Sequence, residues 1–332
     1  DAKSRGSSGR AIFDEIEDDA RRSFAALLRV PPNDVGFVAS TSRGLDAVVK
    51  SIEWLPGDSI VLPSTEFPTA LFAARLLASR GVVVRSVGVA ADGTLDEANL
   101  VAAVDETTRL VVASVVSFRT GQLLDTRALV ARAHEVGALV FLAAVQALGS
   151  VAVEVGDADY VCAASFKWLL GVHGAAGLYV IPRALEITHA PYVGYRGVVD
   201  LFPVHPATEE SYSDARRYQE GLPDYAALAV LHASLEQLAP LRDEIVHHNR
   251  AVTAILRDGL LALGASVLAP GAPRGSLVAF ETPRFAEITS ALADADVTVW
   301  ARDGRVRMSA HAYTTEDDAA TALRVLDTIG AT

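Results

Sequence analysis

The sequence predicts an α/β protein with a doubly wound, mostly parallel sheet of seven strands and a small α+β domain at its C-terminal end. Three observations predict this class. Short runs rich in β-branched residues recur between residues 35 and 181, and most are continuously apolar, which is typical of strands covered on both faces. Longer segments with apolar residues at helical spacing lie between most of these runs, as in β-α-β units. This rhythm changes after about residue 220.

The strand candidates follow one another with helices between them. Strands are expected at residues 35–40, 59–64, 82–89, 110–117, 139–145, 160–165 and 177–181. Helices are expected at residues 43–55, 68–81, 94–104 and 126–137. Ligands of doubly wound sheets bind beyond the carboxyl ends of the strands, so the residues directly after each strand are the candidates for a functional site.

The C-terminal part begins with two long helices, expected within residues 221–263. Strand-like runs and a helix follow, and the last helix opens at Thr315 with Glu316 and further acidic residues in its first turn. These later segments form a compact unit of roughly 90 residues, which we expect to pack on the first unit as a second domain. The expected division is a large domain of residues 1–235 and a small domain of residues 236–332.

Composition narrows the class of protein. The chain has 29 Lys and Arg against 41 Asp and Glu, a net charge of −12, which makes it a poor candidate for binding nucleic acid or an anionic membrane. No apolar run approaches the roughly 20 residues of a membrane helix, and the N-terminus lacks the apolar core of a signal peptide. Because the chain opens on Asp1 rather than Met, we expect some N-terminal sequence to be missing. The single cysteine, Cys162, allows no intramolecular disulfide and fits a cytoplasmic protein.

Unusual residues follow several of the expected strands. Thr41 and Ser42 stand at the mouth of a helix, where they either cap it or, with the free backbone N–H groups, hold a phosphate. Phe67 precedes a proline in a turn and is either a core residue or the cover of a flat cofactor. Gln146 places an amide where a core strand should end. Lys167 lies among apolar and small residues, so it is either a snorkelling or paired charge or a desolvated amine that can attack an aldehyde.

Three longer segments match one family in type and in order. The lysine segment "SFKWLLGVHGAAGLYV", the preceding "ALVFLAAVQALGSVAVEVGDADYV" and the tail "GRVRMSAHAYTTEDDAATAL" resemble the class V aminotransferase family, of the isopenicillin N epimerase-like and cysteine desulfurase-like kind. The resemblance covers nearly the whole chain. It implies the PLP-transferase fold type I, pyridoxal 5′-phosphate (PLP) as the cofactor, a small amino acid as the substrate, and a homodimer.

The resemblance also implies roles for three residues at the reacting centre. Lys167 would form a Schiff base with the cofactor aldehyde and would then shuttle a proton at the substrate Cα. Phe67 would stack on the pyridine ring of the cofactor. Gln146 would hydrogen-bond the phenolic oxygen of that ring.

The phosphate and the substrate carboxylate would be held by further residues that the resemblance assigns. Hydroxyl groups of Thr41, Ser42 and Ser165 would bind the phosphate, together with the dipole at the N-terminus of the helix that starts there. Arg307, in the tail segment, would grip the substrate carboxylate as a bidentate pair, and the alternative is an ion pair on a strand edge. His311 of the same segment is expected to brace this arginine.

One position departs from the family in a way that bears on the reaction. Where relatives carry an aspartate that pairs with the ring nitrogen, this chain has Ala143. A carboxylate there keeps the nitrogen protonated, so that the ring draws off the negative charge of a carbanion. Transamination depends most heavily on that delocalisation. Ala143 therefore favours a lyase, acting by C–S cleavage or β-elimination, or an epimerase, over a transaminase.

Two further departures leave an alternative open. Leu222 stands where relatives carry a threonine that reaches the phosphate across a dimer, and residues 297–309 contain no mobile cysteine of the kind that a desulfurase needs. Cys162 lies inside an expected core strand, where a buried structural thiol is the favoured interpretation. The losses at Ala143 and Leu222 favour a non-catalytic protein that keeps the fold as a scaffold or binding module. The retained Lys167 favours an enzyme.

Overall fold

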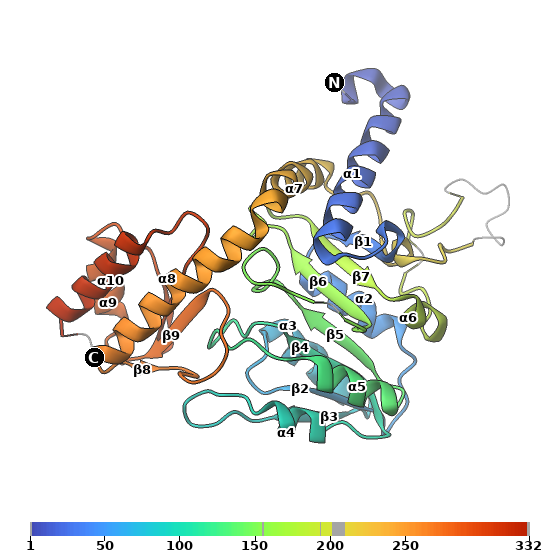
Figure 1. Cartoon of the computed structure of the whole chain (residues 1–332). Coiled ribbons are helices and arrows are strands. Elements are labelled where there is room, and N and C mark those ends of the chain that lie inside the picture. Colours follow the sequence, from blue (N-terminus) through green and yellow to red (C-terminus); the bar gives the residue numbers. More distant parts are fainter. Residues whose placement is uncertain (1, 155, 193, 201–209, 331–332) are drawn as a thin grey trace.

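The computed structural model describes residues 2–330 except residues 155, 193 and 201–209, and it confirms the predicted α/β class (Figure 1). Seven strands form the main sheet, in the order β1-β7-β6-β5-β4-β2-β3. Their bounds are β1 (Val35–Val38), β2 (Ser59–Pro63), β3 (Val83–Val87), β4 (Thr108–Ser114), β5 (Leu139–Ala143), β6 (Tyr160–Ala164) and β7 (Ala176–Val180). Strands β2 to β6 are parallel, and β7 runs antiparallel to both of its neighbours. The carboxyl ends of β2, β4, β5 and β6 therefore meet at one edge.

Helices cover both faces of the main sheet. They are α1 (Arg10–Leu28), α2 (Thr41–Ser51), α3 (Pro68–Ala78), α4 (Glu97–Ala102), α5 (Arg127–Glu135), α6 (Pro182–Ile187) and α7 (Tyr225–Leu238). Side chains of α1, α4, α5 and α7 pack on one face, and those of α2, α3 and α6 pack on the other. Because consecutive residues of a strand point to opposite faces, Val111 packs with the first group and Val112 with the second. This two-sided burial explains why the inner strands are mostly apolar, whereas the edge strand β3 is partly exposed and carries Arg85.

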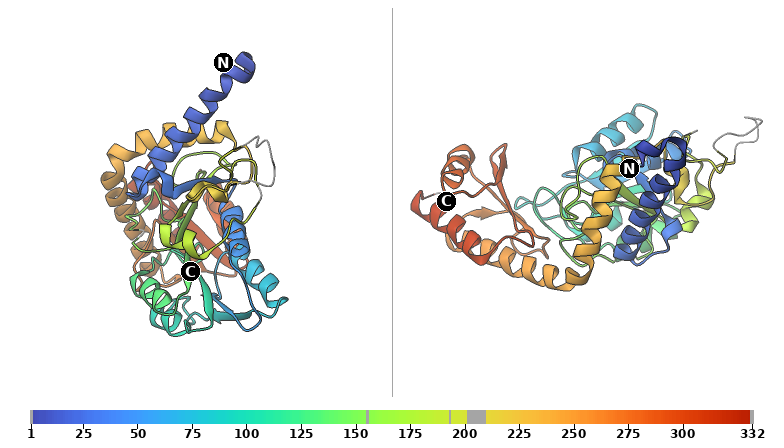
Figure 2. Two further views of the ribbon diagram at one scale, coloured as in Figure 1. Left: turned by 90° about the vertical axis from the view of Figure 1, so that its right-hand side faces the viewer. Right: turned by 90° about the horizontal axis from the view of Figure 1, so that it is seen from above.

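Helix α1 is absent from the elements predicted from the sequence. Phe24 of α1 packs where Gly177 of β7 leaves room, since a Cβ on that glycine would lie 2.4 Å from the Phe24 ring. The same helix carries a buried ion pair, with Arg21 Nη2 2.6 Å from Glu17 Oε1. Figures 1 and 2 show that the N-terminal part of α1 projects from the body of the molecule, whereas its later turns lie against α7.

The C-terminal part combines strands and helices, as predicted, and its strands form a second, antiparallel sheet. Its strands are β8 (Ser266–Val267), β9 (Leu277–Glu281), β10 (Trp300–Arg302) and β11 (Arg305–Ser309), in the order β10-β11-β9-β8. The helices of this part are α8 (Arg242–Ala262), α9 (Phe285–Ala293) and α10 (Glu316–Thr328). Thr315 caps α10 in a capping box with Asp318, as its acidic first turn indicates. The predicted division after residue 235 falls inside the last turn of α7, and the domain boundary itself stays a prediction.

The loop after β4 ties the two sheets together. Gln122 of this loop forms a β-bridge with Arg274, and Arg274 Nη1 donates to the backbone oxygen of Thr120 at 2.7 Å. Gly121 has a φ of +82°, and a Cβ there would lie 2.2 Å from the backbone oxygen of Leu277. Only glycine allows this conformation and this close approach, so it holds the small sheet near the carboxyl edge of the main one.

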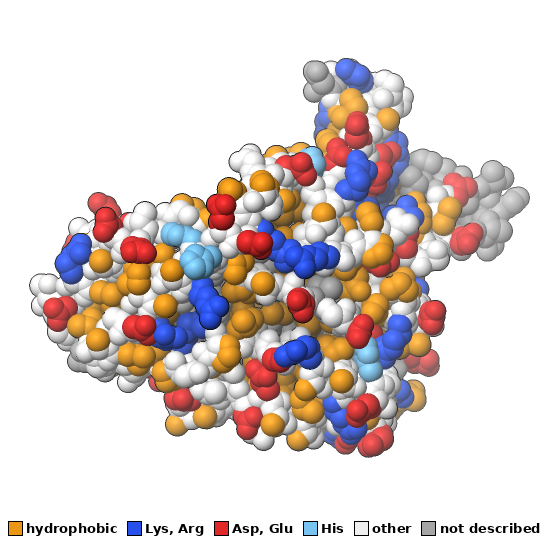
Figure 3. All heavy atoms as spheres, in the orientation of Figure 1, with side chains coloured by type: hydrophobic (Ala, Val, Ile, Leu, Met, Phe, Trp, Pro, Cys, Tyr) orange, Lys and Arg blue, Asp and Glu red, His pale blue; other side chains and the backbone are white. Residues whose placement is uncertain are grey.

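Charged side chains of both signs are interspersed on the face of the molecule that Figure 3 shows. Among the described helices, none combines the length and the apolar character that a membrane span requires. Within the described part of the chain, no group of three or more His, Cys, Asp or Glu side chains is placed to hold a metal ion.

Candidate active site

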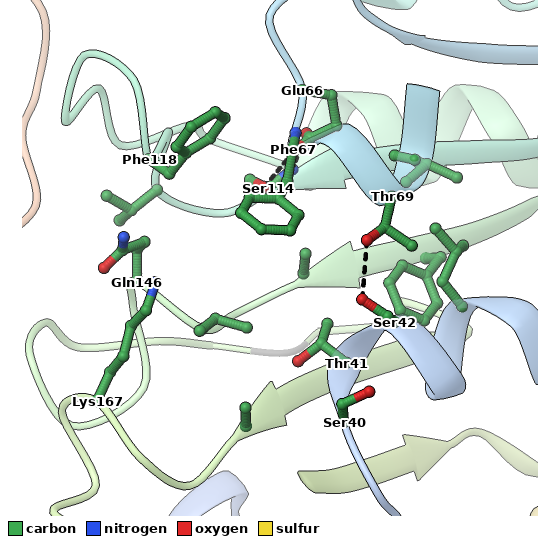
Figure 4. Close-up of a pocket in the computed structure, with 18 of the residues that line it drawn as sticks. Ser40, Thr41, Ser42, Glu66, Phe67, Thr69, Ser114, Phe118, Gln146 and Lys167 are labelled. Carbon is green, nitrogen blue, oxygen red and sulfur yellow. Dashed lines mark hydrogen bonds between the residues drawn. The ribbon is translucent and has the colours of Figure 1, made fainter. Parts of the chain in front are cut away.

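A cavity of about 180 Å³ lies at the carboxyl edge of the main sheet, on the face that α2 and α3 cover. Its floor is apolar and includes Val112 of β4, Phe141 and Ala143 of β5, and Ala164 of β6. Figure 4 shows the polar side chains around this floor. Those that line the cavity are Ser40, Thr41, Ser42, Glu66, Thr69, Ser114, Gln146 and Lys167. Most of the site residues expected from the sequence thus line one cavity beyond the strand ends.

Lys167 follows β6 by three residues and lines the cavity from a tight loop. The loop is closed by hydrogen bonds from Leu170 N to the backbone oxygen of Lys167 at 3.0 Å and from Gly171 N to that of Ser165 at 2.9 Å. Burial, and to a smaller extent the positive charge of Arg307, lowers the pKa of Lys167 to about 8. No carboxylate of the described residues pairs with it, so the alternative of a paired core charge does not apply.

Gln146 is fixed by Trp168, a residue whose role no sequence pattern predicts. The indole N–H of Trp168 donates to Gln146 Oε1 at 3.0 Å, so the amide oxygen is engaged and the amide NH₂ is left for a ligand. The Trp168 side chain stacks on His311 at a centroid distance of 5.1 Å, and His311 stacks on Tyr313 at 4.6 Å. The expectation that His311 braces Arg307 is therefore corrected: its ring packs in a stack against the lysine loop.

Thr41 and Ser42 lie at the N-terminus of α2, and neither is its cap. Ser40 caps the helix by accepting from Arg43 N at 3.2 Å. The Ser42 hydroxyl lies 2.8 Å from that of Thr69, across the cavity wall. Thr41 Oγ1 is buried and has no oxygen or nitrogen partner among the described residues. The thiol of Cys162 in β6, a weak hydrogen-bonding group, lies beside it. The capping interpretation therefore fails for both residues, and the first backbone N–H groups of α2 face the same end of the cavity.

Phe67 forms part of the cavity wall and not of the core. It precedes α3, whose first residue is Pro68, and 48% of its surface is exposed. Its ring lies edge-on to that of Phe118, with centroids 5.2 Å apart and an interplanar angle of 76°. The core interpretation of Phe67 is therefore wrong, and its ring is available to cover a flat ligand.

Ser165 does not face the cavity, although the resemblance assigns it to the phosphate. Its hydroxyl donates to the backbone oxygen of Val172, and its side chain is buried. The neighbours Ala164 and Phe166 line the cavity instead. The cause is the alternation of side chains at the end of β6, which turns Ser165 away when Ala164 points in. In this structure the Ser165 hydroxyl is therefore not placed to bind a phosphate in the cavity.

Ala143 lies on the cavity floor, as expected for the position where relatives carry an aspartate. Its partner in the β4–β5 register is Ser114, and both side chains line the cavity. A carboxylate that is not predicted from the sequence, Glu66, lies on the other side of this serine and accepts its hydrogen bonds. Burial raises the pKa of Glu66 above its usual range. Its partner Ser114 lies 48 residues away in the chain, so no local pattern reveals the pair.

Arg307 lies on β11 and reaches toward the cavity from the small sheet. Its Nη1 donates to the backbone oxygen of Phe118 at 2.8 Å, and its guanidinium lies 5.0 Å from the Trp300 ring centroid. Arg307 Nε is buried without a hydrogen-bond partner, and burial lowers the pKa of the guanidinium. The alternative interpretation of Arg307, an ion pair on a strand edge, does not apply, because no carboxylate of the described residues pairs with it. Arg307 contacts the cavity wall through Phe118 and does not line the cavity itself.

Leu222 and Cys162 do not line the cavity. Leu222 is 62% exposed at the surface. Cys162 is fully buried in β6, as predicted, and burial raises the pKa of its thiol to about 12. A thiol with so high a pKa is inert near neutral pH, which agrees with a structural role.

Comparison with known proteins agrees with this geometry. The model of the class-V aminotransferase family matches residues 3–321 of the 332. A probable cysteine desulfurase of Methanothermobacter thermautotrophicus is 32% identical over 163 residues, which cover 48% of this chain and 41% of the relative. A kynureninase of Pseudomonas fluorescens is 29% identical over 260 residues, 74% of this chain and 61% of the relative. The chain thus spans less than two thirds of the length of both relatives.

Solved structures share the fold. The cystine C-S lyase C-DES in complex with its reaction product cysteine persulfide matches with a TM-score of 0.87 at 23% identity, over 97% of this chain and 89% of that one. A variant of C-DES that carries glycine covalently linked to the PLP cofactor matches with a TM-score of 0.85 at 24% identity, over 97% and 88% of the two chains. The chain belongs to the class-V aminotransferase family.

Proposed function

We propose that this protein is a PLP-dependent enzyme, a lyase that acts at Cα and Cβ of a small amino acid, by C–S cleavage or β-elimination, with Lys167 as its Schiff-base lysine. The state of Lys167 carries the proposal. Its amine is largely buried at the cavity, its pKa is lowered to about 8, and no carboxylate of the described residues pairs with it. Such an amine is a nucleophile and a base near neutral pH.

The cavity fits PLP at three places. At one end, the hydroxyl of Thr41, which has no oxygen or nitrogen partner among the described residues, the hydroxyl of Ser42 and the free N–H groups of α2 suit the phosphate. At the other end, Lys167 Nζ suits the aldehyde, and the free amide NH₂ of Gln146 suits the phenolic oxygen. Phe67 suits the face of the ring. When bound, the cofactor supplies an electron-withdrawing ring that stabilises negative charge at the substrate Cα.

The chain's own groups would bind the substrate and move its proton. Lys167 would accept the Cα proton whenever its amine is free, because an amine with a pKa of about 8 exists partly as the free base near neutral pH. Arg307 would bind the substrate carboxylate, since its hydrogen bond to Phe118 fixes the guanidinium beside the cavity and leaves Nε without a partner.

The floor of the cavity supports a lyase over a transaminase. Ala143 brings no carboxylate to the end of β5, so delocalisation of negative charge into a protonated ring has less support from that strand. Expulsion of a good leaving group from Cβ removes the negative charge at Cα, so a lyase depends less on that delocalisation. An epimerase, whose carbanion is short-lived, also depends on it less and is the second candidate. The buried, high-pKa thiol of Cys162 supports a lyase that releases its sulfur product over a desulfurase that stores sulfur on a cysteine.

The products of the reaction test the proposal. The PLP-saturated protein is incubated with L-cystine, L-cysteine and L-alanine, and pyruvate, sulfur products, D-alanine and the amine form of the cofactor are measured. A lyase forms pyruvate and sulfur products with cystine or cysteine faster than it converts the cofactor to its amine form with alanine. Lys167→Ala is the control and should lose both reactions. Fast formation of the amine form without elimination would contradict a lyase, and fast formation of D-alanine would select the epimerase.

The proposal includes a homodimer. Apolar side chains of the lysine loop are exposed in the single chain: Phe166 is 37% exposed, Leu170 44% and Val172 45%. An apolar rim beside a cavity supports coverage by a second copy. Sedimentation velocity should give about twice the mass of the chain, and a concentration-independent monomer would contradict this part of the proposal.

A further inference from the structure

We propose that Ser114, positioned by Glu66, is the residue that faces the pyridine nitrogen of the cofactor, in place of the carboxylate that Ala143 lacks. The inference rests on the proposed binding of PLP in the cavity. It assigns the buried Glu66 a positioning role toward the cofactor, through Ser114.

Ser114 stands beside Ala143 at the same level of the sheet. The two residues are partners in the parallel β4–β5 register, and both line the cavity. Neighbouring strands lie about 4.8 Å apart. A hydrogen-bonding group on Ser114 is therefore displaced by one strand from the position where relatives carry their aspartate, on the same face of the sheet.

Glu66 holds Ser114 through both of its carboxylate oxygens. Glu66 Oε2 accepts from Ser114 N at 2.6 Å, and Oε1 accepts from the Ser114 hydroxyl and from Phe67 N at 2.7 Å. With its hydrogen donated to Glu66, Ser114 Oγ presents its lone pairs as acceptors. A protonated ring nitrogen can donate to Ser114 Oγ, and the negative charge of Glu66 then lies one hydrogen bond behind it. Figure 4 shows this pair, Ser114 and Glu66, at a side of the cavity apart from Lys167.

The other polar groups of the cavity suit other parts of the cofactor. Lys167 and Gln146 suit the aldehyde and the phenolic oxygen, and the hydroxyls of Thr41 and Ser42 suit the phosphate. The Thr69 hydroxyl is bonded to that of Ser42. The ring nitrogen is the polar atom of the cofactor that these contacts leave over. Ser40 is engaged as the cap of α2, so Ser114 and Glu66 are the remaining polar residues of the cavity lining.

Electrostatics agree with this assignment. Glu66 is only 5% exposed, and burial raises the pKa of its carboxyl, so a negative charge there lacks compensation in the cofactor-free protein. No Lys or Arg donates to Glu66 among the hydrogen bonds of the described residues. A cationic ring nitrogen at Ser114 would supply the missing positive charge. Because a hydroxyl separates the two charges, their interaction is weaker than that of a direct carboxylate contact.

The test measures protonation of the ring nitrogen separately from turnover. The probe is 4-deoxypyridoxine 5′-phosphate labelled with ¹⁵N in the ring, which has no aldehyde and so binds without reacting with Lys167. At a pH where the free probe is unprotonated at nitrogen, the wild-type protein should shift the ¹⁵N signal toward the protonated form. Glu66→Gln and Ser114→Ala should shift it back and weaken binding by about tenfold to a hundredfold, the range for a hydrogen bond to a charged group.

Two further variants make the test decisive. Ser117→Ala, three residues beyond Ser114 and outside this cavity, is the matched control and should leave the probe's signal and affinity unchanged. The double variant Glu66→Gln with Ala143→Asp moves the carboxylate across by one strand and should restore the protonated signal, which a misfolded protein could not do. The inference is overturned if both single variants bind the probe like the wild type with an unchanged ¹⁵N shift, because Glu66 then only anchors its turn. If the wild type binds neither the probe nor PLP, the proposed function fails together with the inference.

Discussion

Replacement of Lys167 by methionine should change how the stability of the cofactor-free protein depends on pH. Methionine keeps an unbranched apolar chain and removes the amine. The pKa of Lys167 is lowered from 10.5 to about 8 in the folded protein, so charging the buried amine costs the folded state roughly 3 kcal/mol below that pH. The wild-type protein bears this cost near neutral pH, and Lys167→Met does not.

The sign follows from proton uptake. Between pH 8 and 10.5 the unfolded chain holds a proton on this lysine that the folded chain has lost, so the free energy of unfolding of the wild type rises with pH in that window. The stability advantage of Lys167→Met should therefore shrink by about 2 kcal/mol from about pH 7 to about pH 9.5. Urea unfolding of both proteins, stripped of PLP, measures the difference, in which the titration of all other groups cancels. A pH-independent difference would refute the lowered pKa and with it the view of Lys167 as a ready nucleophile.

Three further substitutions test other parts of the site. Trp168→Phe removes the indole donor to Gln146. It should lower the free energy of unfolding by about 1 kcal/mol, measured by urea unfolding, and weaken PLP binding severalfold, measured by cofactor titration. An unchanged affinity for PLP would mean that the Gln146 amide needs no positioning. Thr41→Val removes a buried hydroxyl without an oxygen or nitrogen partner, so the cofactor-free protein should be as stable as the wild type or about 1 kcal/mol more stable while its affinity for inorganic phosphate falls; a clear loss of stability would contradict that environment. Gly44 of α2 packs closely on Cys162 of β6, so Gly44→Ala places a Cβ 2.7 Å from Cys162 Sγ and should cost roughly 1–3 kcal/mol in thermal or urea unfolding. Adding Cys162→Ala should restore much of that loss, and a failure to do so would place the strain elsewhere.

The main sheet could be predicted because its strands are buried on both faces. Continuous apolar runs such as residues 139–145 leave no other environment for the backbone, and the helices between them must cross over in parallel units. Helix α1 could not be placed in the same way, because it stands outside the β-α-β rhythm. Its place depends on contacts distant in sequence, such as Phe24 against Gly177.

The candidate site could be predicted in part for a related reason. Residues that follow parallel strands meet at one edge, which is why Thr41, Gln146 and Lys167 line one cavity. Ser165 fails this rule because proximity to a strand end does not set the direction of a side chain. Glu66 could not be predicted because its role depends on a hydrogen bond to a strand that is distant in the sequence, and no residue spacing indicates such a contact.

The most direct test of the account is to locate the cofactor on the chain. The protein is incubated with PLP, reduced with borohydride and digested, and the peptides are identified by mass spectrometry. The chain contains only two other lysines, Lys3 and Lys50, and Lys50 is paired with Asp46 at 2.9 Å. The account predicts a stoichiometric label on Lys167 that is absent from Lys167→Ala. Labelling confined to Lys3 or Lys50, or no label at saturating PLP, would contradict it.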